Sequence, residues 1–94
     1  MENSIPRNQM IAKINKAYPS LFTKTTEEFN GSKGGIWSGS ESDATAKDLF
    51  RLFDYYADGK RYELGVHNEI GELLRKNGWF AEWHDAGTIM FWQA

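Results

Sequence analysis

The sequence lacks two features that would narrow its function, cysteine and long apolar runs. None of its 94 residues is a cysteine, which excludes disulfide bonds, thiolate nucleophiles, iron–sulfur clusters and every cysteine-containing zinc site. The N-terminal stretch MENSIPRNQMIAKINKAYPS is polar and interrupted, without the apolar run of ~7 residues that a signal peptide needs. We therefore expect no signal peptide, no membrane span and a cytoplasmic protein.

A strong excess of one charge is also missing. The net charge is −2, from 11 basic and 13 acidic residues. A mildly acidic chain without a basic stripe lacks the electrostatic footprint of a nucleic-acid-binding protein. The chain is also too weakly acidic to imitate a phosphate backbone. We therefore expect no nucleic-acid partner.

Length and composition indicate a single soluble domain over residues 1–94. Apolar residues make up 40% of the chain and charged residues 26%, close to the average for globular proteins. A domain of this size can bury one hydrophobic core without disulfides or a metal, although its margin of stability is modest.

The first and the last helix are predicted from apolar residues at helical spacing. Residues 7–18 form the first, with Ser4 as its N-cap, and this helix must end before Pro19. Residues 66–78 form the last. Gly71 within it indicates the close approach of another backbone, because a helical glycine is otherwise unfavourable.

The middle of the chain allows two interpretations. Apolar residues at helical spacing favour a helix over residues 43–59. A hairpin turning at Asp58-Gly59 is the alternative, because this dipeptide is a strong two-residue turn signal. Residues 54–63 fit either interpretation.

Strands are predicted around the glycines and at the C-terminus. The stretches TKTTEEF and GGIWSG flank a glycine-rich turn, and residues 79–92 alternate around HDAG as a hairpin. The element order is then α-β-β-α-α-β-β. This order predicts an α+β fold, in which two or three helices pack on a short antiparallel sheet of about four strands.

The ionisable residues show no pattern typical of an active site. His84 and Asp85 are neighbours on a strand, so their side chains point to opposite faces. His67 with His84 and a carboxylate would make a metal site only if separate elements converged, and no HExxH spacing supports this. The glycine cluster lacks the order of a phosphate-binding loop. We expect no catalytic residues, no metal and no cofactor.

Aromatic residues are the feature that stands out, at 15% of the chain. Both faces of the C-terminal hairpin are apolar, although a two-layer domain normally leaves one side of its sheet in water. The second face must therefore be covered by the chain itself or by another molecule. One such division places Trp79, Trp83, Met90 and Trp92 on one face and Phe80, Ile89 and Phe91 on the other.

The stretches GIWSGSES, LFDYYA, YELGVHNEI and GWFAEWHDAGTIMFW resemble small single-domain proteins of phages and other mobile elements, including integron cassettes. The resemblance spans residues 20–92 and brings no catalytic or ligand-binding residue with it. It implies an accessory protein that acts by binding, a class that includes inhibitors of host systems.

These observations predict a non-enzymatic protein that presents an aromatic surface, centred on its C-terminal hairpin, to a protein partner or to a second copy of itself. The residues expected to contact the partner are Trp83, Trp92, Phe91, Tyr55 and Tyr56. The alternative is a small-ligand module with a tryptophan-lined pocket between sheet and helices. Its ligand-binding residues would be His67, Glu82, Tyr62 and Trp37.

Overall fold

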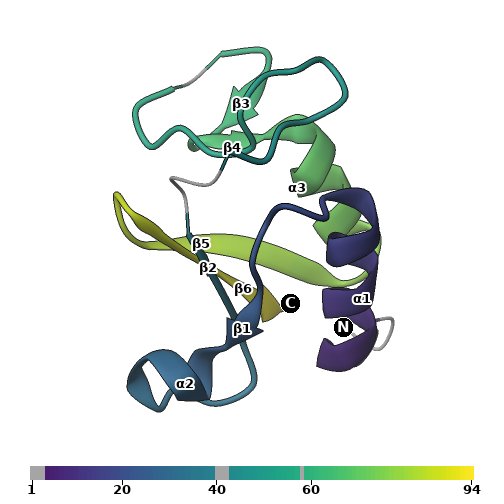
Figure 1. The fold of residues 1–94 in the computed structure, drawn as a ribbon, viewed down its shortest axis with the longest axis vertical. Coiled ribbons are helices and arrows are strands. Elements are labelled where there is room, and N and C mark those ends of the chain that lie inside the picture. Colours follow the sequence, from purple (N-terminus) through teal and green to yellow (C-terminus); the bar gives the residue numbers. More distant parts are fainter. Residues whose placement is uncertain (1–3, 40–42, 58) are drawn as a thin grey trace.

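A computed structural model describes residues 4–39, 43–57 and 59–94. It shows a small α+β fold with a central antiparallel sheet (Figure 1). The elements in chain order are α1 (Arg7–Ala17), β1 (Lys24–Thr25), α2 (Thr26–Asn30), β2 (Ile36–Gly39), β3 (Tyr62–Glu63), β4 (Val66–His67), α3 (Asn68–Arg75), β5 (Trp79–Asp85) and β6 (Thr88–Gln93).

The main sheet has the strand order β1-β2-β6-β5, and every neighbouring pair is antiparallel. Strands β3 and β4 form a separate two-stranded hairpin, which lies with its neighbouring loops at one end of the molecule (Figure 1). The predicted fold class is therefore confirmed. Within the described residues, no helix has the length and apolar character that crossing a bilayer requires.

One face of the main sheet lies against the hydrophobic core. Residues directly opposite each other in an antiparallel pair share a face, and the register places Ala81 opposite Phe91 and Trp83 opposite Ile89. The inner face of the sheet meets buried side chains from both long helices. These helical residues are Met10 and Ile14 from α1 and Ile70 and Leu74 from α3.

The predicted division of the hairpin into faces is wrong. The register places Phe80 opposite Trp92 and Glu82 opposite Met90, so Trp92 lies on the outer face, away from Trp83. The cause is an irregularity between Trp83 and Asp85. An extra residue in one strand shifts the pairing, and the shift moves side chains of the partner strand to the other face.

The first helix ends before Pro19 as predicted, but its N-cap is a different residue. Tyr18, just before Pro19, is its C-cap, with a φ of −135°. Its N-cap is Pro6 and not Ser4. The Ser4 hydroxyl instead donates to the carbonyl of Gly78 at 2.9 Å, and this bond joins the N-terminal segment to the start of the last hairpin.

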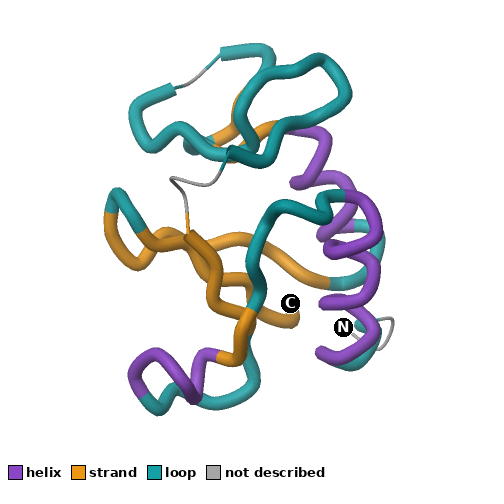
Figure 2. The backbone as a smooth tube through the Cα atoms, viewed as in Figure 1, coloured by secondary structure: helices purple, strands orange, loops and turns teal. Residues whose placement is uncertain are grey.

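The predicted helix over residues 43–59 is absent from the described part of that segment, which Figure 2 shows as loop. The Asp48 carboxylate accepts the backbone N–H of Phe50 at 3.0 Å, and Leu49 has a φ of +71°. Such a side chain-to-backbone bond competes with helix formation. The alternative hairpin has its turn at Asp58-Gly59, and Asp58 lies outside the described residues. Its second stretch pairs with another segment instead, because β3 pairs with β4 across a turn at Leu64 and Gly65.

The other differences concern the ends of elements. The predicted strand TKTTEEF is a strand only at Lys24–Thr25 and then becomes α2, because Thr25 and Glu28 form a capping box. Helix α3 begins at Asn68, with His67 as its N-cap. The strand predicted in GGIWSG and the C-terminal hairpin are confirmed as β2, β5 and β6.

Candidate functional site

Tyr55, Tyr56 and Trp83 form one contiguous cluster, although they come from distant parts of the chain. The ring centroids of Tyr55 and Trp83 are 5.0 Å apart and those of Tyr55 and Tyr56 are 5.2 Å apart, with both pairs nearly perpendicular. The Trp83 indole N–H donates to the carbonyl of Leu64 at 2.7 Å. Tyr56 and Leu64 are 86% and 82% exposed. We call these four residues the aromatic surface.

Gly65 allows the segments that carry the aromatic surface to approach one another. Its φ is +80°, and a Cβ atom at this position would lie 2.6 Å from the carbonyl oxygen of Asp54 and 3.1 Å from the ring of Trp83. The Gly65 carbonyl also accepts the N–H of Asp54 at 2.8 Å. A residue without a side chain therefore lies where the Tyr55 loop, the β3–β4 turn and β5 meet.

The other two residues predicted to contact a partner do not belong to this surface. Phe91 is completely buried on the inner face of the sheet, so it is a core residue. Trp92 is half-buried on the outer face. Its ring lies so close to Gly35 that a Cβ atom there would approach within 2.5 Å. Of the five residues predicted to contact a partner, the structure brings together Trp83, Tyr55 and Tyr56 and places Phe91 and Trp92 elsewhere.

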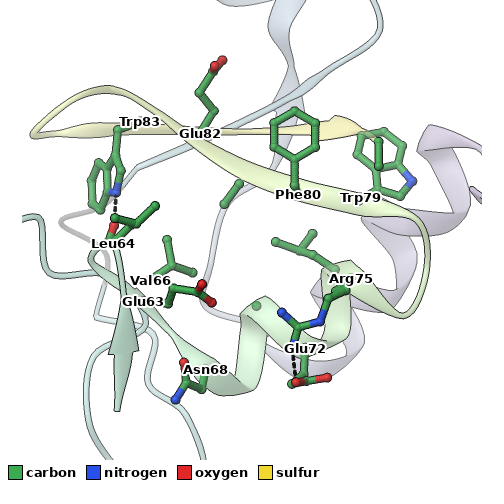
Figure 3. A pocket seen from close by; sticks show the side chains of 14 residues that line it. Glu63, Leu64, Val66, Asn68, Glu72, Arg75, Trp79, Phe80, Glu82 and Trp83 are labelled. Carbon is green, nitrogen blue, oxygen red and sulfur yellow. Dashed lines mark hydrogen bonds and ion pairs between the residues drawn. The ribbon is translucent and has the colours of Figure 1, made fainter. Parts of the chain in front are cut away.

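A groove of about 600 Å³ begins at Trp83 and runs between β5, α3 and the β3–β4 hairpin (Figure 3). Val66, Leu74 and Ala81 line its apolar part. Ala81 lies between Trp79 and Trp83 on the same face of β5, and its small side chain leaves space between the two indoles. Because β5 is the last strand in the sheet order, the groove follows an edge of the sheet.

Acidic side chains surround this groove. Glu72 pairs with Arg75 on α3. Glu63 and Glu82 also line the groove, and neither carboxylate has an ion-pair or hydrogen-bond partner within residues 4–39, 43–57 and 59–94. Figure 3 shows Glu82 and Phe80 on the side of β5 away from α3. The groove therefore has an apolar floor with Glu63 beside it, and Glu82 lies at the same strand but on the side away from α3.

In comparisons with known proteins, no family model, no curated protein and no solved structure matches this chain. The function is therefore inferred from the geometry of the site.

The four residues of the predicted small-ligand site do not converge. Glu82 lines the groove. Trp37 lies on the outer face of the sheet, because it pairs with Met90 in β6. His67 and Tyr62 lie together, with ring centroids 5.4 Å apart, but the Tyr62 hydroxyl donates to a backbone carbonyl at 2.6 Å. The structure therefore does not bring these four residues together, although a groove does exist beside Glu82.

The histidine–carboxylate contact that the structure contains is one that the sequence did not indicate. His67 Nε2 lies 3.0 Å from Asp48, and His67 Nδ1 accepts the backbone N–H of Glu69 at 3.0 Å. Since Nδ1 accepts a hydrogen bond, the proton of the neutral ring is on Nε2 and is donated to Asp48. Both ring nitrogens are thus engaged, and His67 is only 6% exposed. The pair joins the loop at Asp48 to the start of α3.

Protonation of Asp48 is expected to loosen this connection. The backbone N–H of Phe50, and then the imidazole of His67, hold the pKa of the Asp48 carboxyl below its ordinary value. A carboxylate with a lowered folded-state pKa stabilises the protein above its unfolded-state pKa, and the stabilisation is lost as the pH falls through the folded-state value. Urea midpoints of wild type and Asp48→Asn should therefore differ above about pH 5, begin to approach each other near pH 4, and meet only once the pH has fallen below the lowered pKa of Asp48. A pH-independent difference would contradict this account.

His84 and Asp85 have separate structural roles. The His84 ring meets Phe29 edge-on at 5.0 Å, whereas Asp85 accepts the N–H of Gly87 at 2.9 Å in the hairpin turn. Phe29 also packs on Trp37 at 4.8 Å, so the chain itself covers part of the outer face. Among the residues that the structure describes, no group of three or more His, Asp or Glu side chains is placed to hold a metal ion.

Proposed function

We propose that this chain is a non-enzymatic binding protein and that its aromatic surface is the contact for a protein partner. The observation that supports the proposal is the union of Tyr55, Tyr56, Trp83 and Leu64 in one contiguous, largely solvent-facing cluster. Tyrosine and tryptophan are enriched among the residues that dominate binding energy at protein interfaces. Their rings bury a large area for few rotatable bonds.

The arrangement of the cluster also favours binding over a purely structural role. Trp83 packs against Phe53 of the core, with the two ring centroids 6.3 Å apart, and is held by its hydrogen bond to the carbonyl of Leu64. It therefore forms a fixed base for Tyr55, which in turn carries Tyr56. A rigid aromatic base loses little conformational entropy on association. Because Trp83 supports the core as well, Trp83→Ala would change both folding and binding.

The double variant Tyr55→Ser/Tyr56→Ser tests the surface without removing Trp83. We expect it to retain the fold and to weaken partner binding by about 2 kcal/mol, or roughly 30-fold. The measurement is quantitative capture from a lysate of the source cells, followed by calorimetric titration of the protein that wild type retains.

The matched control is Leu49→Asn. Leu49 is an exposed apolar residue outside the aromatic surface, and asparagine tolerates its positive φ. The control should bind as wild type does. Equal binding by wild type and the double tyrosine variant would contradict the proposed function.

Association of the chain with itself is the second form of this proposal. Light scattering on a size-exclusion column over a range of loading concentrations measures the mass directly. A dimer that dissociates in the double tyrosine variant would identify a second copy as the partner, because a self-complementary contact uses the same residues on both copies.

A further inference from the structure

We propose that the groove beside β5 binds an extended peptide segment of the partner, which adds as a strand to the edge of the sheet and carries apolar and basic residues in alternation. The proposal rests on the proposed function, because it names the kind of partner segment that would lie next to the aromatic surface. Trp83 belongs to both the surface and the groove.

The hydrogen-bonding pattern of the hairpin shows which backbone groups face the free edge. Ala94 donates its N–H to the Gly78 carbonyl at 2.8 Å, in the same register as the β5–β6 pairs. Hydrogen-bonded and non-hydrogen-bonded pairs alternate in an antiparallel ladder. Phe80 and Glu82 therefore bond to β6, and the N–H and carbonyl of Ala81 point outward. No strand pairs with this edge of β5 within the part of the chain that the structure describes.

The side chains along this edge differ between the two faces of β5. Toward α3, the added strand would meet the apolar floor beside Ala81, in the groove of about 600 Å³ that Trp79 and Trp83 also line. On the opposite side it would meet Phe80, which is 45% exposed, and Glu82. A lysine there could lay its aliphatic stem on the ring and bring its ammonium to the carboxylate.

The charges favour a basic peptide over a second copy of this chain. Among the residues that the structure describes, neither Glu63 nor Glu82 forms an ion pair, so two copies joined along β5 would bring these unpaired carboxylates toward one another. Successive side chains of a strand alternate between its two faces. An added strand can therefore place basic side chains next to Phe80 and Glu82 and apolar side chains next to the floor of the groove. Strand addition gains affinity from the main chain and specificity from these alternate positions.

The test uses a labelled peptide of about eight residues that alternates valine and lysine, a length that matches an ordinary strand. Its repeat makes the result independent of the register in which it binds. We expect fluorescence anisotropy to give a dissociation constant below about 1 mM. The matched valine–glutamate peptide should bind at least about tenfold more weakly, because it places carboxylates against Glu82.

Backbone methylation of the peptide separates strand addition from nonspecific attraction. In an antiparallel arrangement, the valine opposite Ala81 exchanges both hydrogen bonds with it, whereas in a parallel arrangement the flanking lysines do so. One of the two sets of backbone amides, that of the valines or that of the lysines, should therefore be needed for binding. Methylating this set should weaken binding by about tenfold, and methylating the other set should have little effect.

Ala81→Pro tests the same edge from the protein side. Because the Ala81 N–H faces outward, proline removes no bond to β6 and is tolerated as in other edge strands. This variant should bind the valine–lysine peptide about tenfold more weakly. Glu82→Lys should also weaken binding, whereas Asp43→Lys, a control near Phe22 and Trp37 on the outer face, should not.

Several outcomes would overturn the proposal. Strand addition would be contradicted if the wild type did not bind the valine–lysine peptide, if it bound the valine–glutamate peptide equally well, or if the two methylation patterns had equal effects. A dimer that Ala81→Pro dissociates would assign the edge to a second copy instead. The peptide titrations do not involve Tyr55 and Tyr56. If the peptide fails to bind, only the proposed peptide site in the groove is contradicted, and the proposed function is not. Partner capture that survives the double tyrosine variant contradicts the proposed function.

Discussion

Phe91→Ala is expected to lower the free energy of unfolding by about 3–5 kcal/mol, the range for removal of a large aromatic side chain from a core. Phe91 is completely buried. It lies between Ile36 of β2 and Ala81 of β5 in the register, with its ring 6.1 Å from Phe53. A domain of this size has a total stability of only about 5–15 kcal/mol. The variant should therefore be partly unfolded near 37 °C, as urea denaturation followed by circular dichroism will show.

Phe80→Ala is the matched control for Phe91→Ala. Phe80 is also an aromatic residue of the hairpin, but it lies on the outer face and remains 45% exposed. Its replacement should change the free energy of unfolding by less than about 1 kcal/mol. If the two variants had equal stability, the division of the hairpin into an inner and an outer face would be wrong.

The parts of the fold that follow from local signals were predictable. Pro19 ends the first helix because the residue before a proline is kept out of helical angles, and Tyr18 indeed has a φ of −135°. The glycine after the last helix, Gly78, has a φ of +81°, as a C-terminal helix signal requires. The hairpin after it depends on alternation and on a short turn, and both are visible in a few neighbouring residues.

The middle segment was mispredicted because its apolar period fits two structures. Ala46 and Phe53 are buried as a helix would require, but Leu49 is 82% exposed and Phe50 is half-exposed. The buried residues instead belong to a loop, which the Asp48–His67 contact and a β-bridge between Phe53 and Val66 hold in place. Both of these contacts span distant parts of the chain, and periodicity carries no information about them.

The candidate site shows the same division between local and distant effects. Trp83, Tyr55 and Tyr56 could be proposed because aromatic residues are common at interfaces. These residues lie together because three segments of the chain approach one another at Gly65. No local sequence motif indicates this approach. Phe91 was included because alternation does not show which face of the hairpin is buried, and the structure places it in the core. Trp92 was expected beside Trp83, but an irregularity near Trp83 changes the register and puts the two on opposite faces. The groove likewise depends on how α3 lies beside β5.

Gly65→Ala is expected to lower the free energy of unfolding by about 2–4 kcal/mol and to disrupt the aromatic surface. The left-handed backbone, with a φ of +80°, is unfavourable for alanine, and the new methyl group would lie 2.6 Å from the Asp54 carbonyl oxygen. This oxygen is part of the backbone and cannot rotate away as a flexible side chain would. Asp54 is followed by Tyr55, and the methyl group would also meet the ring of Trp83 at 3.1 Å. Urea denaturation will measure the loss of stability, and tryptophan fluorescence will report the displacement of Trp83.

The control for this substitution is Gly71→Ala, which should have the opposite sign. Gly71 lies within α3, and among the described residues no atom outside its own stretch of helix would lie within 4 Å of its added Cβ. The close backbone approach that the sequence suggested there is therefore absent. Alanine in a helix interior is favoured over glycine by about 0.5–1 kcal/mol, so Gly71→Ala should raise the urea midpoint while Gly65→Ala lowers it. If both substitutions were neutral, Gly65 would not be what holds the Tyr55 loop against β5, and the aromatic surface would need another explanation for its shape.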